Sequence, residues 1–412
     1  MHSNLKTILF VLACVGFVKD IAAAEWALKG SLGQALQYDD NIALSTTDKA
    51  AVAGYLLSPS LEATRKTAAI DLGVTAQGNI RRYDDSSWDC DNYNLGSDNS
   101  YRTKRSVFSL AGAYSVSCSY AQQLKDTGLL VPSSQATSYR IAPAWTWQWT
   151  ALDQLTLNTS YSQTSYDNSV SSVDPSTGLI FSGNDTYSVN LGGNHQWDKH
   201  LSLNEKLLFS NVQYTGLNAS TQNLFGFQLG GNYKINRYWA VNASGGPMLV
   251  DSRQSSNSVA SGQDNSLSVG SVANINLSYD GQLSKFSTGY ANSVSPSAIG
   301  QTLQSHSLFA NYSYRLSRHV SFDLTGSYIH SESIGAQTSN ILTGPFKRDY
   351  FTAAPSIIWE PAKNWEVKGS YVYRWQDYQQ SSTLQNLNVG TTDSNAVTIS
   401  LGYSWDGVRI SR

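Results

Sequence analysis

The stretch Val397-Thr398-Ile399-Ser400-Leu401-Gly402-Tyr403-Ser404-Trp405 decides the fold, because its character alternates residue by residue. Its odd-numbered residues are apolar or aromatic, and its even-numbered residues are Thr, Ser or Gly. A period of two predicts an extended strand with one apolar and one polar face. Aromatic residues at the end of the apolar face are typical of a strand that meets a membrane interface.

The same alternation recurs along the chain and divides it into about eighteen segments, an even number as in single-chain outer-membrane barrels. The first predicted strand is 26–38 and the last is 394–405, while 93–103 and 201–214 alternate least well. Tight turns such as Trp197-Asp198-Lys199-His200 alternate with long polar connections such as 167–184. Short turns at one end and long loops at the other are typical of outer-membrane barrels.

The composition agrees with a membrane barrel and argues against other classes. Of 412 residues, 41% are hydrophobic, 11% aromatic and only 14% charged, whereas soluble domains average about 25% charged. The net charge of −2 does not indicate a nucleic-acid partner. We therefore predict an all-β protein, a transmembrane antiparallel up-and-down β-barrel of about 18 strands, formed by residues 25–412 as one domain.

Residues 1–24 resemble a secretory signal peptide that is cleaved on export. Lys6 precedes a short apolar core, and Ala22-Ala23-Ala24 provides small residues for cleavage. The apolar core is shorter than the roughly 20 residues of a membrane-spanning helix. Lipidation at Cys14 is a weaker alternative, because cleavage there would cut within the apolar core. We expect the mature chain in the bacterial outer membrane, surrounded by lipid and lipopolysaccharide.

Two cysteines remain after cleavage, Cys90 and Cys118, and we expect them to form a disulfide at one rim of the barrel. The stretches Asp84–Asn92 and Tyr38–Ile42 are rich in acidic and amide side chains. Neither matches the regular spacing of a calcium loop. We expect both to be solvated loop tips and predict no metal site.

The polar face of the predicted strands carries the charged residues that would line a lumen. With the aromatic face outward, the inward face has nine basic and five acidic residues when Lys29 is included. Such charges either select a hydrophilic solute or simply pair across neighbouring strands, and the second explanation is favoured. The predicted lumen residues are Glu62, Asp71, Arg81, Asp98, Arg102, Arg140, Lys234, Lys285, Arg315, Asp323, Glu366, Lys368 and Arg374.

Catalytic and cofactor motifs find little support in the sequence. It contains no HExxH, no GxSxG and no CxxCH. We expect no enzyme activity, no catalytic residue and no bound cofactor.

Tyr38-Asp39-Asp40-Asn41-Ile42, the repeated aromatic–turn–aliphatic hairpins and Leu401-Gly402-Tyr403-Ser404-Trp405-Asp406-Gly407 resemble the β-barrel porin family of the second class. That family includes the EpsL-type outer-membrane barrels of exopolysaccharide gene clusters. The resemblance implies a wide barrel that takes part in export of an extracellular polysaccharide, together with periplasmic polysaccharide-export proteins. The chain departs from general barrel practice at its C-terminus, where Asp406 to Arg412 follow the last aromatic residue.

Two other functions remain open from the sequence. One is a general or substrate-selective diffusion porin for a small hydrophilic solute, in which loop 167–184 would fold into the lumen as a constriction. The other is a barrel that sheathes or anchors a partner protein.

Overall fold

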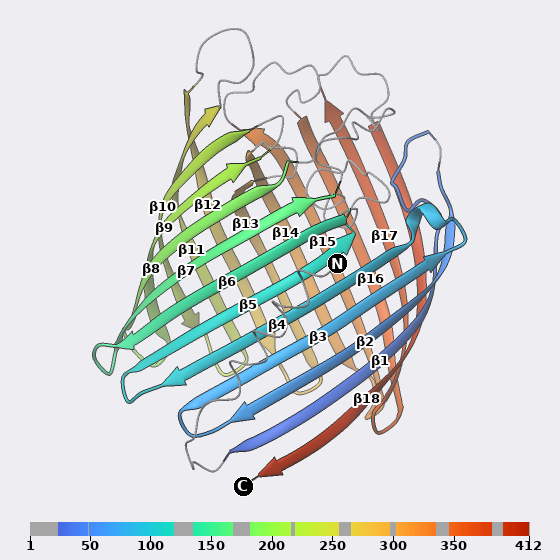
Figure 1. Cartoon of the computed structure of the whole chain (residues 1–412), viewed down its shortest axis with the longest axis horizontal. Coiled ribbons are helices and arrows are strands. Elements are labelled where there is room, and N and C mark those ends of the chain that lie inside the picture. The colour runs from blue at the N-terminus through green and yellow to red at the C-terminus, as the bar shows by residue number, and fades with distance from the viewer. Residues whose placement is uncertain are drawn as a thin grey trace, which may run out of the picture.

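Eighteen strands form one closed antiparallel barrel in the computed structural model, as Figure 1 shows. The structure describes residues 24–47, 49–118, 135–167, 182–215, 219–254, 265–296, 302–334, 346–380 and 390–411. Each strand pairs with its neighbours in the chain, and pairing of the first strand with the last closes the ring. The predicted up-and-down β-barrel is therefore confirmed. Among the described residues, no helix is long and apolar enough to cross a membrane.

The bounds of the strands, with one short 3-10 helix η2, are as follows: β1 Glu25–Asp39, β2 Val52–Lys66, β3 Ile70–Tyr83, η2 Ser86–Trp88, β4 Cys90–Arg102, β5 Ser106–Cys118, β6 Gln135–Gln148, β7 Asp153–Tyr166, β8 Asn184–Gln196, β9 Leu201–Tyr214, β10 Ser220–Lys234, β11 Trp239–Gln254, β12 Asn265–Asp280, β13 Ser284–Pro296, β14 Thr302–Arg315, β15 Val320–Ile334, β16 Phe346–Ala362, β17 Trp365–Gln380 and β18 Gly390–Ser411.

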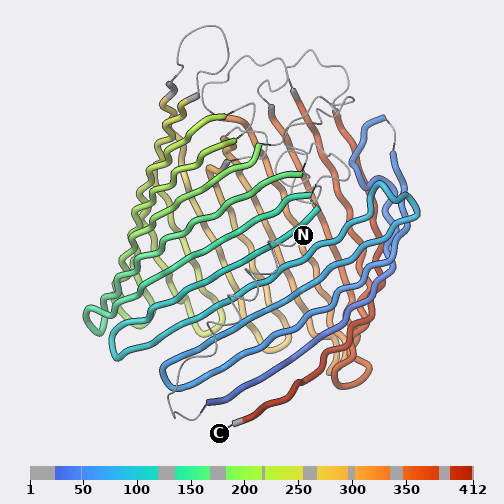
Figure 2. Tube along the Cα trace, in the orientation of Figure 1, coloured from blue at the N-terminus to red at the C-terminus, as the bar shows by residue number. Residues whose placement is uncertain are grey.

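The two ends of the barrel differ in how the strands are connected. At one end, here the turn end, even-numbered strands lead into the next strand through short turns; the Trp197 amide, for example, donates to the Leu201 carbonyl over 3.0 Å. At the other end, here the loop end, the connections are mostly longer, as between β1 and β2. The first and last strands meet at the turn end, because Glu25 pairs with Ser411. Figure 2 shows the short turns at the turn end as tight bends of the coloured trace.

The outer surface of the barrel is apolar. Leu36 and Trp197 are each 66% exposed and Ile399 is 61% exposed. The strand pairing places such residues beside one another on the same face, as with Val189 opposite Phe209. Aromatic rings gather near the turn end, where the Trp145, Trp147 and Trp149 side chains stack with centroids 6.0 and 6.2 Å apart. Side chains of this kind fit a lipid-facing band with interfacial aromatic rings.

The last strand is longer than predicted, because it continues through a bulge. Leu28 pairs with Val408 but Gly30 pairs with Trp405, so β18 carries an extra residue between them. Gly407 accommodates the bulge with a φ of 82°, and a Cβ at this position would lie 1.7 Å from the Leu28 carbonyl oxygen. A bulge shifts the alternation by one residue. Val408 and Ile410 are consequently exposed like the outward residues before the bulge, and the predicted end at Trp405 is wrong.

Candidate functional site

The connection between β1 and β2 folds toward the inner wall of the barrel at the loop end. Tyr38 points outward and is 52% exposed, whereas Asp39 is 1% exposed and Asn41 is fully buried. The Asn41 side-chain amide donates to the Ser45 carbonyl, the Thr392 hydroxyl and the Asp393 carbonyl at 3.0–3.1 Å. These bonds fix the connection to β18. The expectation that Tyr38–Ile42 forms a solvated loop tip is therefore wrong.

A buried ion pair anchors the start of this connection. Arg374 of β17 pairs with Asp39, and their side chains are 13% and 1% exposed. Ser394 of β18 completes the contact, because its hydroxyl donates to Asp39 over 2.8 Å and accepts from Arg374 over 2.8 Å. A buried pair that loses one partner leaves an uncompensated charge, which is strongly destabilising. Asp39 thereby ties the end of β1 to two strands from the far end of the chain.

Asp40 adds a second, partly exposed attachment to β18. Its carboxylate accepts hydrogen bonds from the backbone amide and the side-chain amide of Asn395 at 2.7 and 2.8 Å. Burial raises the pKa of Asp40, but these hydrogen bonds and the charge of Lys49 outweigh that effect and hold the pKa below its ordinary value of 3.8. Asp40 therefore stays ionised, and the attachment is intact, across the neutral range.

The connection continues across the inner wall as far as β15 and β16. Leu44 is fully buried and packs against Tyr350 of β16 and Ile329 of β15. It adopts a left-handed backbone conformation with φ of 49°, which is uncommon for leucine. Its carbonyl accepts a hydrogen bond from the Gln376 side chain over 3.2 Å, and Gln376 in turn accepts from Arg348. Residues 39–45 thus lie against four strands, β15 to β18. We call these residues, together with the side chains that hold them, the inner latch.

A second set of contacts inside the barrel is apolar. The inward face of β9 to β12 carries a buried cluster of Val212, Tyr214, Leu224, Met248, Val250 and Val272. Val294 of β13 and Ile334 of β15 pack against it. The hydroxyl of Thr302 in β14 donates to Gln222 in β10, although these strands are not neighbours in the sheet. The loop-end parts of β13 to β15 therefore lie against the inside of β9 to β12.

This cluster also explains why β9 alternates poorly in sequence. Leu207 and Phe209 face outward and are exposed, whereas Leu208 and Val212 face inward and pack in the cluster. Both faces of the strand are apolar, so the period of two is hidden.

The strand register places the predicted lumen residues on the face opposite the exposed apolar side chains. Arg374 lies in the inner latch. Arg102 pairs with Asp71 over 2.9 Å, and Lys285 pairs with Asp280 over 3.1 Å, both in exposed positions. Whether these residues or the remaining ones guide a solute stays a prediction.

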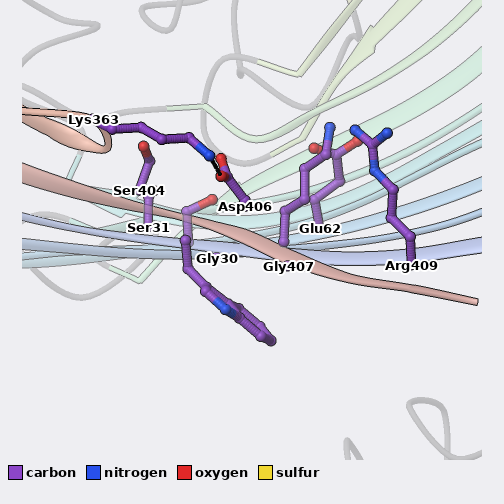
Figure 3. Close-up of a pocket in the computed structure, with 11 residues that line it drawn as sticks. Gly30, Ser31, Glu62, Lys363, Ser404, Asp406, Gly407 and Arg409 are labelled. Atoms are coloured by element: carbon purple, nitrogen blue, oxygen red, sulfur yellow. Dashed lines mark ion pairs between the residues drawn. The ribbon is translucent and has the colours of Figure 1, made fainter.

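A charged pocket of about 780 Å³ lies near the turn end beside the β1–β18 pairing. Figure 3 shows the side chains that line it. Lys363 reaches from the β16–β17 turn to Asp406, with a nitrogen–oxygen distance of 2.5 Å. Lys29, Glu62 and Arg409 also line the pocket. Three basic and two acidic side chains meet there, and Lys29 and Glu62 also face each other in the β1–β2 register.

Cys90 and Cys118 form a disulfide that joins the loop-end parts of β4 and β5, with Cα atoms 5.9 Å apart. The neighbouring acidic stretch is only partly solvated. Trp88 of η2 is 5% exposed and packs with Ile42, Val52 and Tyr83. Among the described residues, no group of three or more His, Cys, Asp or Glu side chains could hold a metal ion.

The residues that sequence reasoning missed are those that hold the inner latch, chiefly Asn41, Leu44, Arg348 and Gln376. A signal was present in Arg348 and Gln376, which occupy inward positions of their strands. Their role could not be predicted from the sequence, because they contact residues 39–45 only after the barrel closes. The predicted constriction loop 167–184 lies almost wholly outside the described residues, as does the predicted signal peptide 1–24.

No protein-family model matches the sequence, and no curated protein matches it. Among solved structures the chain is similar to OpdQ of Pseudomonas aeruginosa, with 14% identity and a TM-score of 0.45, covering 94% of this chain and 99% of that one. It is similar to OccAB4 of Acinetobacter baumannii, with 10% identity and a TM-score of 0.49, covering 94% and 98%. It is also similar to the ferric citrate transporter FecA in its unliganded form, with 9% identity and a TM-score of 0.49, covering 92% and 78%. Likenesses of this degree do not identify a family, so the function must be derived from the geometry of this chain.

Proposed function

We propose that the chain is a bacterial outer-membrane pore through which small hydrophilic solutes diffuse, and that the inner latch forms part of its constriction. The exposed apolar band with aromatic rings near the turn end supports a position in the membrane, since large exposed apolar surfaces mark membrane or protein contacts. In this proposal the signal peptide predicted at 1–24 directs export, and the turn end faces the periplasm.

The inner latch is the observation that carries the proposal. Barrels of about 16–18 strands leave an aqueous channel, and a loop fixed inside such a channel limits the size of what passes. Buried contacts from Asp39, Asn41 and Leu44 to β15–β18 hold this segment against the wall. A passive pore for small solutes needs such a fixed restriction, whereas passage of a polymer needs a wide or gated lumen.

Polysaccharide export, suggested by the sequence resemblance, is the second candidate. The motif Tyr38–Ile42 that carries the resemblance also holds the inner latch, so structural need alone accounts for this motif. The predicted lumen residues, nine basic and five acidic with Lys29, would favour anionic solutes modestly in either case.

The test combines a purified system with cells. The folded protein in planar bilayers should give discrete conductance steps, and proteoliposomes should admit small sugars with a rate that falls as sugar size rises. A variant in which a short Gly-Ser linker replaces residues 41–50 should show a higher conductance and admit larger sugars. In cells, deletion of the gene should slow solute uptake and leave surface polysaccharide normal. Absence of conductance, or loss of surface polysaccharide with normal uptake, would overturn the proposal, and the second result would favour export.

A further inference from the structure

One carboxylate lies on the outward face of β9 among apolar neighbours. Glu205 follows Leu203 and precedes Leu207 on that face, and all three side chains are exposed. The register places Glu205 opposite Gly193 of β8 and Leu229 of β10. Leu229 is 57% exposed, so apolar side chains border the carboxylate on this face.

The Glu205 carboxylate has no hydrogen bond or ion pair within the part of the chain that the structure describes. The outward side chains of His195 and Asp153 lie closer to the turn end and pair with each other over 2.6 Å. An ionised group facing hydrocarbon is costly unless a partner compensates it. A cation or hydrogen-bond donor from outside the described part of the chain would compensate this carboxylate.

Gly193 lets this carboxylate lie flat against the barrel. A Cβ at Gly193 would be 2.2 Å from the Glu205 Oε1 atom. Without that Cβ, the carboxylate rests on β8 at a defined place.

A shallow apolar groove lies next to Glu205 on the side of the loop end. It begins at the next outward residue pair along β8 and β9, Leu191 with Leu207. Its volume is about 460 Å³, within the range of about 300–1,000 Å³ usual for small-molecule sites. Leu191 and Leu207 form its lower part, and the rings of Phe209 and Phe225, with centroids 5.0 Å apart, lie one residue pair higher. The polar group and the groove are therefore aligned along the barrel wall, with the polar group nearer the turn end.

We propose that Glu205 and this groove bind one phospholipid of the leaflet at the turn end, with its protonated primary amine on the carboxylate and an acyl chain in the groove. A lipid of that leaflet extends its chains from the turn end toward the loop end, in the same direction as the groove. An ammonium group donates charge-assisted hydrogen bonds to a carboxylate, whereas a choline headgroup has no N–H to donate. The site rests on the membrane position proposed above and does not depend on what crosses the lumen.

Native mass spectrometry of the detergent-solubilised protein, titrated with phosphatidylethanolamine, phosphatidylcholine or phosphatidylglycerol, tests the site. The wild-type protein should retain phosphatidylethanolamine preferentially. Glu205→Gln should weaken that binding roughly tenfold or more, as expected for a lost hydrogen bond to a charged group. Glu62→Gln, which removes a carboxylate from the inner face, should bind the lipid like wild type. Gly193→Ala keeps the charge but displaces the carboxylate, and should also reduce the preference.

Equal retention of all three lipids, or unchanged binding by Glu205→Gln, would overturn the lipid site. A dimer that dissociates on the Glu205→Gln substitution would also overturn it, because a second copy would then cover the groove. Conductance in planar bilayers separates this proposal from the pore. Glu205→Gln should conduct like wild type, and a wild-type protein that binds the amine lipid but does not conduct would refute the pore alone.

Discussion

Arg374→Gln should release the inner latch. The substitution leaves the Asp39 carboxylate 1% exposed and without its cationic partner. Breaking a buried ion pair in this way costs about 3–5 kcal/mol, which corresponds to a factor of roughly 10² to 10⁴ in the equilibrium between attached and released states. Single-channel recordings should show a higher mean conductance and stronger current fluctuations than wild type. Urea unfolding should show a lower midpoint.

Arg102→Gln is the matched control, because it removes an ion pair of the same type from an exposed position. The side chains of Arg102 and Asp71 are 60% and 33% exposed, and exposed pairs contribute about 0–1 kcal/mol. Asp39→Asn combined with Arg374→Gln should recover much of the loss, since no uncompensated charge is then buried. If Arg374→Gln and Arg102→Gln behave alike, or if Arg374→Gln leaves both the current and the urea midpoint unchanged, the reasoning about the latch is refuted.

Three further outcomes are expected. The pKa of Asp40 in the folded state is lowered from the unfolded value of 3.8. Its contribution to stability is therefore complete above pH 3.8 and is lost as the pH falls through the lowered pKa. Asp40→Asn should flatten the acid limb of the curve of unfolding free energy against pH. Gly407→Ala places an alanine in a left-handed backbone conformation with a steric clash, at a cost of about 1–3 kcal/mol. It should therefore lower the temperature at which the folded gel band is lost. Gly369→Ala should not, because a Cβ there would meet nothing within 4 Å. On the outer face, Leu401→Arg should cost about 2–4 kcal/mol near the bilayer midplane while Ser400→Arg costs little, and equal urea midpoints would contradict the assigned facing.

The sequence was sufficient to predict the barrel because the alternation within each strand shows which of its residues face lipid. Alternation in residues 397–405 depends only on which neighbours face lipid, so it can be read without knowing the partner strands. The strand count of eighteen followed from repeating that pattern. The alternation itself is obscured at two places. At Gly407 a bulge shifts the alternation, and in β9 an inward apolar cluster hides it.

The inner latch was beyond reach because its contacts join residues far apart in the chain. Asn41 donates hydrogen bonds to Thr392 and Asp393. It lies near them only because the ring closes between β1 and β18. Viewed alone, Tyr38–Ile42 has the polar composition of an exposed loop. Burial of Asp39 and Asn41 depends on the chain direction after β1, which no periodicity encodes.

Closure of the ring between β1 and β18 gives the barrel a seam. Every other ladder joins strands that the chain also connects by a turn or a loop, whereas this one is held by non-covalent contacts alone. Separating the two strands strains no covalent connection, so the circumference opens most readily along this line. The buried contacts from Asp39 and Asn41 to β17 and β18 cross this seam at the loop end. The contacts of the proposed constriction therefore also hold the barrel closed.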